Sequence, residues 1–104
     1  MRLSRILCAL TMFSGLTQTV RADDKVTFAR DIAPIIYQNC SVCHRPGAVA
    51  PFSLLSYADA KKRAKQIAVV TQSRFMPPWK AEPGHGEFRN ERTLNASQIK
   101  ALAA

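Results

Sequence analysis

Cys40-Ser41-Val42-Cys43-His44 is the stretch of sequence from which the fold prediction starts. Two thiols three residues apart on a helical turn face the same side, so each can form a thioether with one vinyl group of the same haem. The imidazole of the next residue can then ligate the haem iron from the proximal side. This C-x-x-C-H pattern is the attachment sequence of c-type haem. The sequence therefore predicts one covalent haem c, held by Cys40 and Cys43, with His44 as an axial ligand.

The N-terminus has the three parts of a secretory signal. Residues 1–5 are short and basic, residues 6–16 are mostly apolar, and Val20-Arg21-Ala22 offers small residues at the positions that a signal peptidase reads. The apolar run is too short to span a bilayer as a stable helix. We therefore expect residues 1–22 to be removed and the domain of residues 23–104 to be periplasmic or otherwise exported. An uncleaved anchor or a buried core helix is the alternative.

The composition after cleavage describes one small domain. Roughly 82 residues remain, and the loss of three arginines with the signal lowers the formal net charge from +8 to +5. Cys8 leaves as well, so only the two motif cysteines stay, in an oxidising compartment that would also permit a disulfide between them. A chain this size buries a modest core, to which a haem would add apolar surface. We expect no membrane span after signal removal and no nucleic-acid partner.

The apolar pattern predicts an all-α fold with long loops. A first helix, with Asp31 as its cap and Pro34 near its start, should run toward Cys40 with Phe28, Ile32, Ile35 and Ile36 on one face. A second helix should follow over residues 57–73, where Ser56 and Asp59 resemble a capping box. The inner face of this second helix should hold Ala60, Ala64, Ile67, Ala68 and Thr71.

The rest of the mature chain reads as loops and one short helix. Residues 45–55 contain two prolines and a glycine, and residues 80–92 are rich in turn formers without clear periodicity, so both should be loops. Asn95 and Gln98 can cap a last helix that turns Ile99 and Leu102 inward. The fold is therefore expected to be a few helices joined by long connections.

Met76 is the leading candidate for the sixth iron ligand. It follows the second expected helix and precedes Pro77-Pro78-Trp79, and two prolines stiffen the backbone that would hold its sulfur. A thioether is a soft, neutral ligand that raises the reduction potential of haem iron. Filling a gap in the core is the alternative role of Met76.

His85 is the alternative distal ligand. It lies between two glycines, in a stretch that could bring an imidazole to the iron but that more often forms an exposed loop. On paper, His44 and His85 could also complete a zinc site with the two cysteines. Adjacent Cys43 and His44 rarely point at one metal, so zinc is disfavoured, as is a redox dithiol.

Longer stretches around these residues resemble class I mono-haem cytochrome c domains. Residues 28–35 and 40–47 carry this resemblance. More narrowly, residues 50–55, 74–79 and 86–88 resemble a bacterial subgroup. Its members often stand at the N-terminus of larger exported proteins, ahead of thioredoxin-like or copper monooxygenase-like modules.

The similarity covers the mature chain from about Val26 and implies a small helical fold wrapped around one haem. It also implies Cys40 and Cys43 as attachment points, with His44 and Met76 as axial ligands. The sequence departs from the subgroup at its end, where the last helix usually continues through an aromatic residue. We therefore expect the C-terminal helix to be truncated.

Motif and resemblance together predict an exported cytochrome domain that carries single electrons as its iron cycles between Fe(II) and Fe(III). Its partners would be other redox proteins, and the domain would be a carrier rather than a catalyst by itself. One alternative is an electron-feeding N-terminal module of a larger redox enzyme, with a catalytic domain downstream. The other is a haem-based ligand-binding or sensor domain, which needs an open or labile sixth position.

Two further features have an open interpretation. Lys61, Lys62, Arg63 and Lys65 form a basic cluster that could steer an acidic partner, neutralise haem propionates or simply be a solvated helix face. Trp79 could pack at the haem edge or be an ordinary buried or surface residue. The sequence does not decide between these roles.

Overall fold

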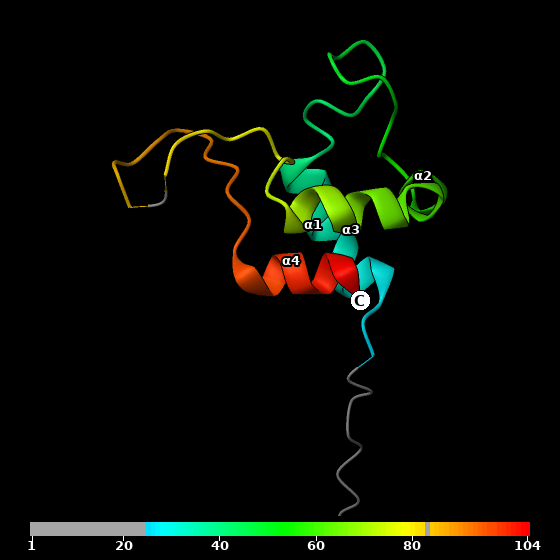
Figure 1. Cartoon of the computed structure of the whole chain (residues 1–104). Helices are drawn as coiled ribbons and strands as arrows, with labels where there is room; N and C mark the ends of the chain where they lie inside the picture. Colours follow the sequence, from blue (N-terminus) through cyan, green and yellow to red (C-terminus); the bar gives the residue numbers. More distant parts are fainter. Residues whose placement is uncertain (1–24, 83) are drawn as a thin grey trace, which may run out of the picture.

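The computed structural model describes residues 25–82 and 84–104, and within them the protein contains helices and loops but no strand. The helical elements in chain order are η1 (Phe28–Ile32), α1 (Ala33–Asn39), α2 (Tyr57–Lys62), α3 (Ala64–Gln72) and α4 (Ala96–Ala103) (Figure 1). The expected all-α class is confirmed for this part of the chain. The expected signal of residues 1–22, with Cys8, lies outside the described residues.

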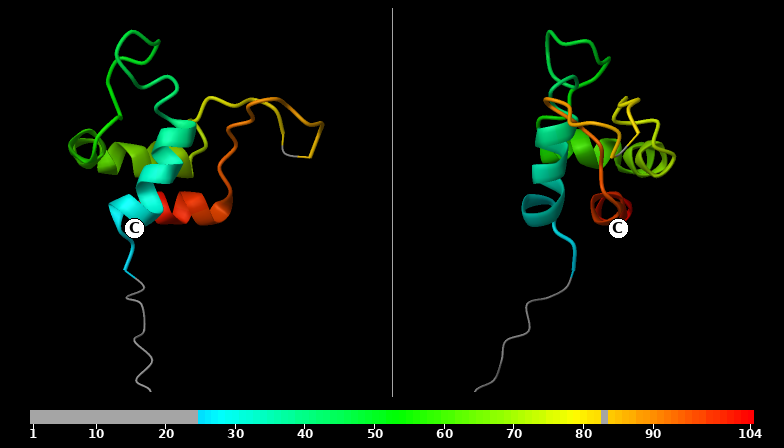
Figure 2. Two further views of the ribbon diagram at one scale, coloured as in Figure 1. Left: turned by 180° about the vertical axis from the view of Figure 1, so that it is seen from behind. Right: turned by 90° about the vertical axis from the view of Figure 1, so that its left-hand side faces the viewer.

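The helix axes run in two main directions. Helices α3 and α4 lie side by side, while η1 and α1 run across them, and α4 also contacts η1 (Figure 2). Two long irregular segments, residues 40–56 and the described residues of 73–95, extend from these helices (Figure 1). Among the described residues, none of the helices has the length and apolar character needed to cross a membrane.

The hydrophobic core lies where these elements meet. Ile36 of α1, Ala60 of α2, Ile67 of α3 and Leu54 of the first long segment are all buried in one cluster. Partly buried side chains pack around it, namely Phe28, Ile32, Cys40, Phe52 and Leu102. The apolar face predicted for the first helix is therefore confirmed. Because Cys40 packs directly on this cluster, the core and the C-x-x-C-H motif are adjacent.

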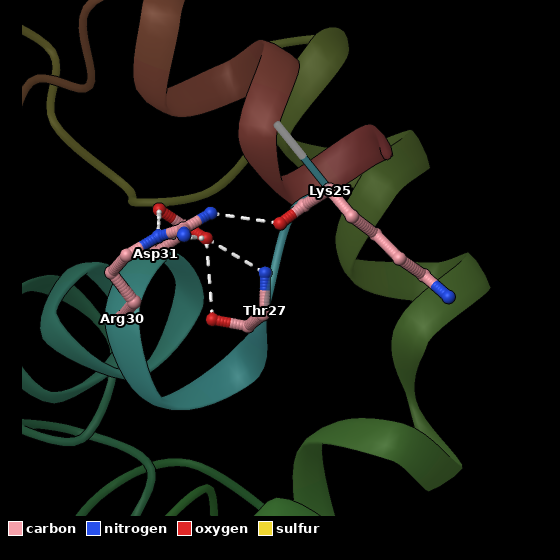
Figure 3. A network of polar contacts seen from close by, with 4 residues as sticks. All are labelled: Lys25, Thr27, Arg30 and Asp31. Carbon is pink, nitrogen blue, oxygen red and sulfur yellow. Dashed lines mark hydrogen bonds and ion pairs between the residues drawn. The ribbon is translucent and has the colours of Figure 1, made fainter. Parts of the chain in front are cut away.

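The start of the first helix differs from the prediction. The chain becomes helical at Phe28, as one π-helical turn that continues into α1, so Asp31 lies inside the helical segment and does not cap it. Instead its carboxylate accepts hydrogen bonds from the Thr27 N–H at 2.7 Å and from the Arg30 Nε at 2.9 Å (Figure 3). These donors hold the pKa of Asp31 below its usual value. Arg30 also donates to the Lys25 carbonyl, at 2.8 Å, which closes the network.

The predicted helix over residues 57–73 is wrong in one respect, because it is interrupted at Arg63. This residue has φ −108° and ψ 7°, and its N–H bonds to the Ala60 carbonyl three residues back, so α2 ends and α3 begins in a new direction. After the break, Ile67 and Thr71 are buried as expected and Ala68 is partly buried, but Ala64 is exposed. The single inner face expected of this helix is thus divided between two short helices.

The predicted helix caps are found at both later helices. Ser56 caps α2 by accepting from the Asp59 N–H at 3.1 Å, although the Asp59 carboxylate reaches the Leu55 N–H and not that of Ser56. At α4 the capping box is complete. Asn95 accepts from the Gln98 N–H and Gln98 accepts from the Asn95 N–H, each at 2.9 Å. Caps of this kind typically stabilise a helix by about 1 kcal/mol, which matters for α4 because it has only eight residues.

Candidate cofactor site

The two motif cysteines lie on a turn that prolongs α1. The Cys40 N–H bonds to the Ile36 carbonyl at 2.8 Å, and the Cys40 carbonyl then accepts from the N–H groups of Cys43 and His44, at 3.1 and 2.9 Å. These bonds keep the backbone coiled through the motif, as its spacing predicts. Both thiols are free and half-buried.

The loop of residues 45–55 folds back on the motif and fixes it. Buried Ser41 donates from its hydroxyl to the Leu54 carbonyl at 2.6 Å, and the Leu54 N–H donates to the His44 carbonyl at 2.9 Å. The Ala50 N–H adds a bond to the Cys43 carbonyl at 3.1 Å. A loop without regular structure thereby satisfies the backbone groups of the motif.

The imidazole of His44 is oriented by Phe52. Its Nδ1 lies 3.1 Å from the Phe52 carbonyl oxygen, and the two rings are in contact with centroids 4.5 Å apart. A carbonyl only accepts, so Nδ1 carries a proton, and in the neutral imidazole Nε2 then has the lone pair. This is the tautomer that an imidazole needs to ligate a metal through Nε2.

The end of α3 positions Met76. Arg74 has a left-handed φ of 57°, which stops the helix and reverses the chain. The Met76 N–H then bonds to the Val70 carbonyl at 3.0 Å, while the Arg74 guanidinium donates to the Leu94 carbonyl at 3.2 Å. The two ends of the second long segment are therefore tied to each other, and the part that carries Met76 is held against the last turn of α3.

A cavity of about 440 Å³ lies between these segments. Its lining includes Cys40, Cys43, His44 and Met76, which are the four residues proposed from sequence, together with mainly apolar side chains that include Phe52 and Trp79. The volume lies in the usual range of cofactor and ligand sites, about 300–1,000 Å³. Met76 is at least 32 positions from the three motif residues in the chain, and the fold brings it to the same cavity. From the sequence alone, a common site for these four residues was only a prediction.

His85, the alternative ligand, does not line this cavity. It is exposed, in the loop of residues 84–92, and its N–H bonds to the Glu82 carbonyl at 3.3 Å. Among the described residues, no three His, Cys, Asp or Glu side chains gather as a metal site. The described residues therefore do not assemble the four zinc ligands considered from the sequence.

The residues present fit a haem. The cavity is largely apolar, as a porphyrin face requires, and it offers two thiols, an imidazole and a thioether. Trp79 and Arg92 line the cavity, and the buried Trp79 Nε1 has no hydrogen-bond partner among the described residues. Buried donors without an acceptor are costly, about 1–3 kcal/mol each. A haem carries two propionates, and carboxylates are the acceptors that such donors suit.

Burial makes Cys40 a poor nucleophile. Loss of hydration, with a smaller contribution from neighbouring Cys43, raises the pKa of the Cys40 thiol to about 11. Reactive dithiols of C-x-x-C enzymes instead depend on a lowered thiol pKa. The electrostatics at Cys40 thus disfavour the redox-dithiol alternative.

No sequence pattern points to Phe52 or Ser41, although both shape the site. Phe52 acts through its carbonyl oxygen, which every residue has, and Ser41 occupies a spacer position of the motif. A signal for Phe52 exists only in the resemblance of residues 50–55 to the bacterial subgroup. Their roles therefore depend on the tertiary structure.

The four cations of the basic cluster line one surface hollow together with Ala64 and Gln66, but their contacts differ. Lys61 lies over the Tyr57 ring at 5.6 Å, whereas the Arg63 guanidinium lies over the Phe52 ring at 4.1 Å, and Lys62 and Lys65 are exposed. Of these four side chains, Arg63 is the one with a cation–ring contact to a residue of the cavity wall.

Comparison with known proteins assigns no family to this geometry: no family model matches the chain, and no curated protein or solved structure is significantly similar to it.

Proposed function

We propose that the protein is an exported mono-haem c-type cytochrome domain that carries single electrons. The observation that carries the proposal is the single cavity lined by Cys40, Cys43, His44 and Met76. One haem in this cavity would supply the chemistry, a one-electron change at its iron. The sequence resemblance to class I cytochrome c domains supports the same function.

The residues of the chain have distinct roles in this proposal. Cys40 and Cys43 would hold the haem covalently, each thiol adding its sulfur and its hydrogen across one vinyl group without net oxidation or reduction. His44 would hold the iron through Nε2, since the Phe52 carbonyl is bonded to its Nδ1. Met76 would supply the second protein ligand, and the apolar lining would keep water from the site.

The high pKa of Cys40 indicates that attachment needs assistance. At neutral pH this thiol stays protonated, so spontaneous addition is slow. A haem maturation system, which works outside the cytoplasm, would supply that assistance. The expected secretory signal would deliver the chain to the same compartment.

Haem staining after denaturing electrophoresis tests the proposal. The chain, expressed with its N-terminal signal and a haem maturation system, should retain one haem on the gel. The double variant Cys40→Ala/Cys43→Ala should lose the stain, and Cys8→Ala should leave the mature product unchanged. Loss of the haem from the unmodified protein on denaturation, or no haem at all, would contradict the proposed function.

A further inference from the structure

The Phe52 ring connects the guanidinium of Arg63 to the imidazole of His44. The Arg63 Cζ lies 4.1 Å from the Phe52 ring centroid, and the Phe52 ring lies 4.5 Å from that of His44. The same Phe52 presents its carbonyl oxygen to His44 Nδ1 at 3.1 Å. Phe52 therefore contacts Arg63 and His44 at once.

The break between α2 and α3 places Arg63 in this position. Its backbone leaves the helical region, with ψ near 7°, and the side chain then reaches Phe52 and donates to the Gln66 side chain at 3.3 Å. Gln66 and Phe52 both line the cavity. A planar guanidinium lies flat on an aromatic face, which a lysine ammonium cannot match.

We propose that Arg63 is a positioning residue for the haem ligand His44 and that it acts through Phe52. Its guanidinium holds the Phe52 ring in place, and so keeps the Phe52 carbonyl on the Nδ1 proton and the Nε2 lone pair directed into the cavity. This inference rests on the proposed haem function. It gives one member of the basic cluster a role that its neighbours do not share.

The exchange rate of the His44 Nδ1 proton, measured by NMR in the reduced haem protein, tests this role. Arg63→Met should speed the exchange by about two- to fivefold, the range expected when a half-exposed cation–π contact is lost. Lys62→Met is the matched control, because it removes the same charge from the exposed neighbouring position, and its rate should equal that of the unmodified protein. Haem staining of each variant is recorded first.

A second pair of variants tests whether Arg63 acts through Phe52. Phe52→Leu should also speed the exchange, and adding Arg63→Met to it should produce no further increase. If Arg63→Met loses its far-UV helix signal, Arg63→Lys replaces it, with the same direction of change expected because the planar contact is lost. Equal rates in the Arg63 and Lys62 variants, or additive effects with Phe52→Leu, would overturn the inference. A protein without haem would instead contradict the proposed function.

Discussion

The backbone N–H of Met76 donates to the Val70 carbonyl oxygen, at 3.0 Å, across the reversal that ends α3. This bond joins a residue of the irregular segment to one inside the helix. Both residues line the cavity that is also lined by Cys40, Cys43 and His44. The position of the Met76 side chain is thus set by helix α3 as well as by the prolines that follow it.

Replacing Met76 should change the visible spectrum and the reduction potential of the haem iron. If Met76 is the distal ligand, Met76→Ala should erase the weak sulfur-to-iron charge-transfer band near the red edge of the visible spectrum. The reduction potential should also fall, because the thioether that favours Fe(II) is lost. Spectroscopy and redox titration of the oxidised protein measure both effects.

His85→Ala is the control for that experiment, because His85 is exposed and lies outside the cavity lining. It should alter neither the band nor the potential by much. The reverse pattern, a silent Met76→Ala and an altered His85→Ala, would show bis-histidine ligation. A high-spin spectrum in the unmodified protein would favour a ligand-binding or sensor domain.

Trp79→Phe should raise the pKa of a haem propionate and leave the covalent attachment of the haem intact. The substitution keeps an aromatic ring but removes the buried indole N–H that has no partner among the described residues. Loss of a donor to the ionised form raises the pKa of a carboxylate, so the reduction potential should become pH-dependent in a higher pH range. Phe88→Leu, which alters the ring packed 6.0 Å from Trp79 but no donor, should keep the original pH dependence. Identical titrations for the two variants would exclude Trp79 as a propionate donor.

Ser41→Ala should destabilise the protein through the loop, not through the haem contacts. It removes the buried hydroxyl that donates to Leu54 at 2.6 Å and leaves that carbonyl without this bond. The expected loss in free energy of unfolding is about 1–3 kcal/mol, measured by urea denaturation. Ser73→Ala, which removes an exposed 3.3 Å bond, should cost less than about 0.5 kcal/mol. Similar losses at both serines would show that the loop is not fixed by Ser41.

The thiol of Cys40 should weaken the haem-free protein at alkaline pH. Its pKa is about 11 in the folded protein against 9.0 for an ordinary thiol, so the unfolded chain ionises first as pH rises. The contribution of this thiol to the free energy of unfolding is therefore fully present below about pH 9, and it is lost progressively as the pH rises to about 11. Urea unfolding of the reduced protein across this pH range should show the decline, and the Cys40→Ala variant should show less of it.

The alkylation rate of Cys40 tests the same raised pKa. At pH 8 Cys40 should alkylate far more slowly in the folded protein than in the protein unfolded by urea, because its thiolate fraction in the folded protein is roughly a hundredfold smaller. Equal alkylation rates would contradict the raised pKa.

Local patterns predicted the local structure well. The capping box at Asn95 is formed as expected, Ser56 forms its half of the predicted box, and the apolar spacing around Ile36 marks a buried face. Each of these depends on residues within one turn of one another, so neighbouring side chains and backbone decide them. Two predictions were wrong: Asp31 was expected to cap the first helix, and one continuous helix was expected through Arg63. In both places another contact of the side chain accompanies the departure from the predicted pattern. Asp31 bonds backward to Thr27, and Arg63 leaves the helix where its side chain meets Phe52, a contact between segments.

The sequence by itself determined the helical class of the described residues and the chemical types of the proposed ligands, because hydrophobic spacing and the C-x-x-C-H motif are local properties. Only the tertiary structure decided which distant side chains share a cavity. It places Met76 beside the motif and His85 outside, and it supplies the Phe52 carbonyl for His44. The physical reason is that such contacts depend on where chain reversals, such as the one at Arg74, direct the following segment. Every residue has a backbone carbonyl and every residue except proline has a backbone N–H, so the pairing of these groups cannot be read from side-chain identity.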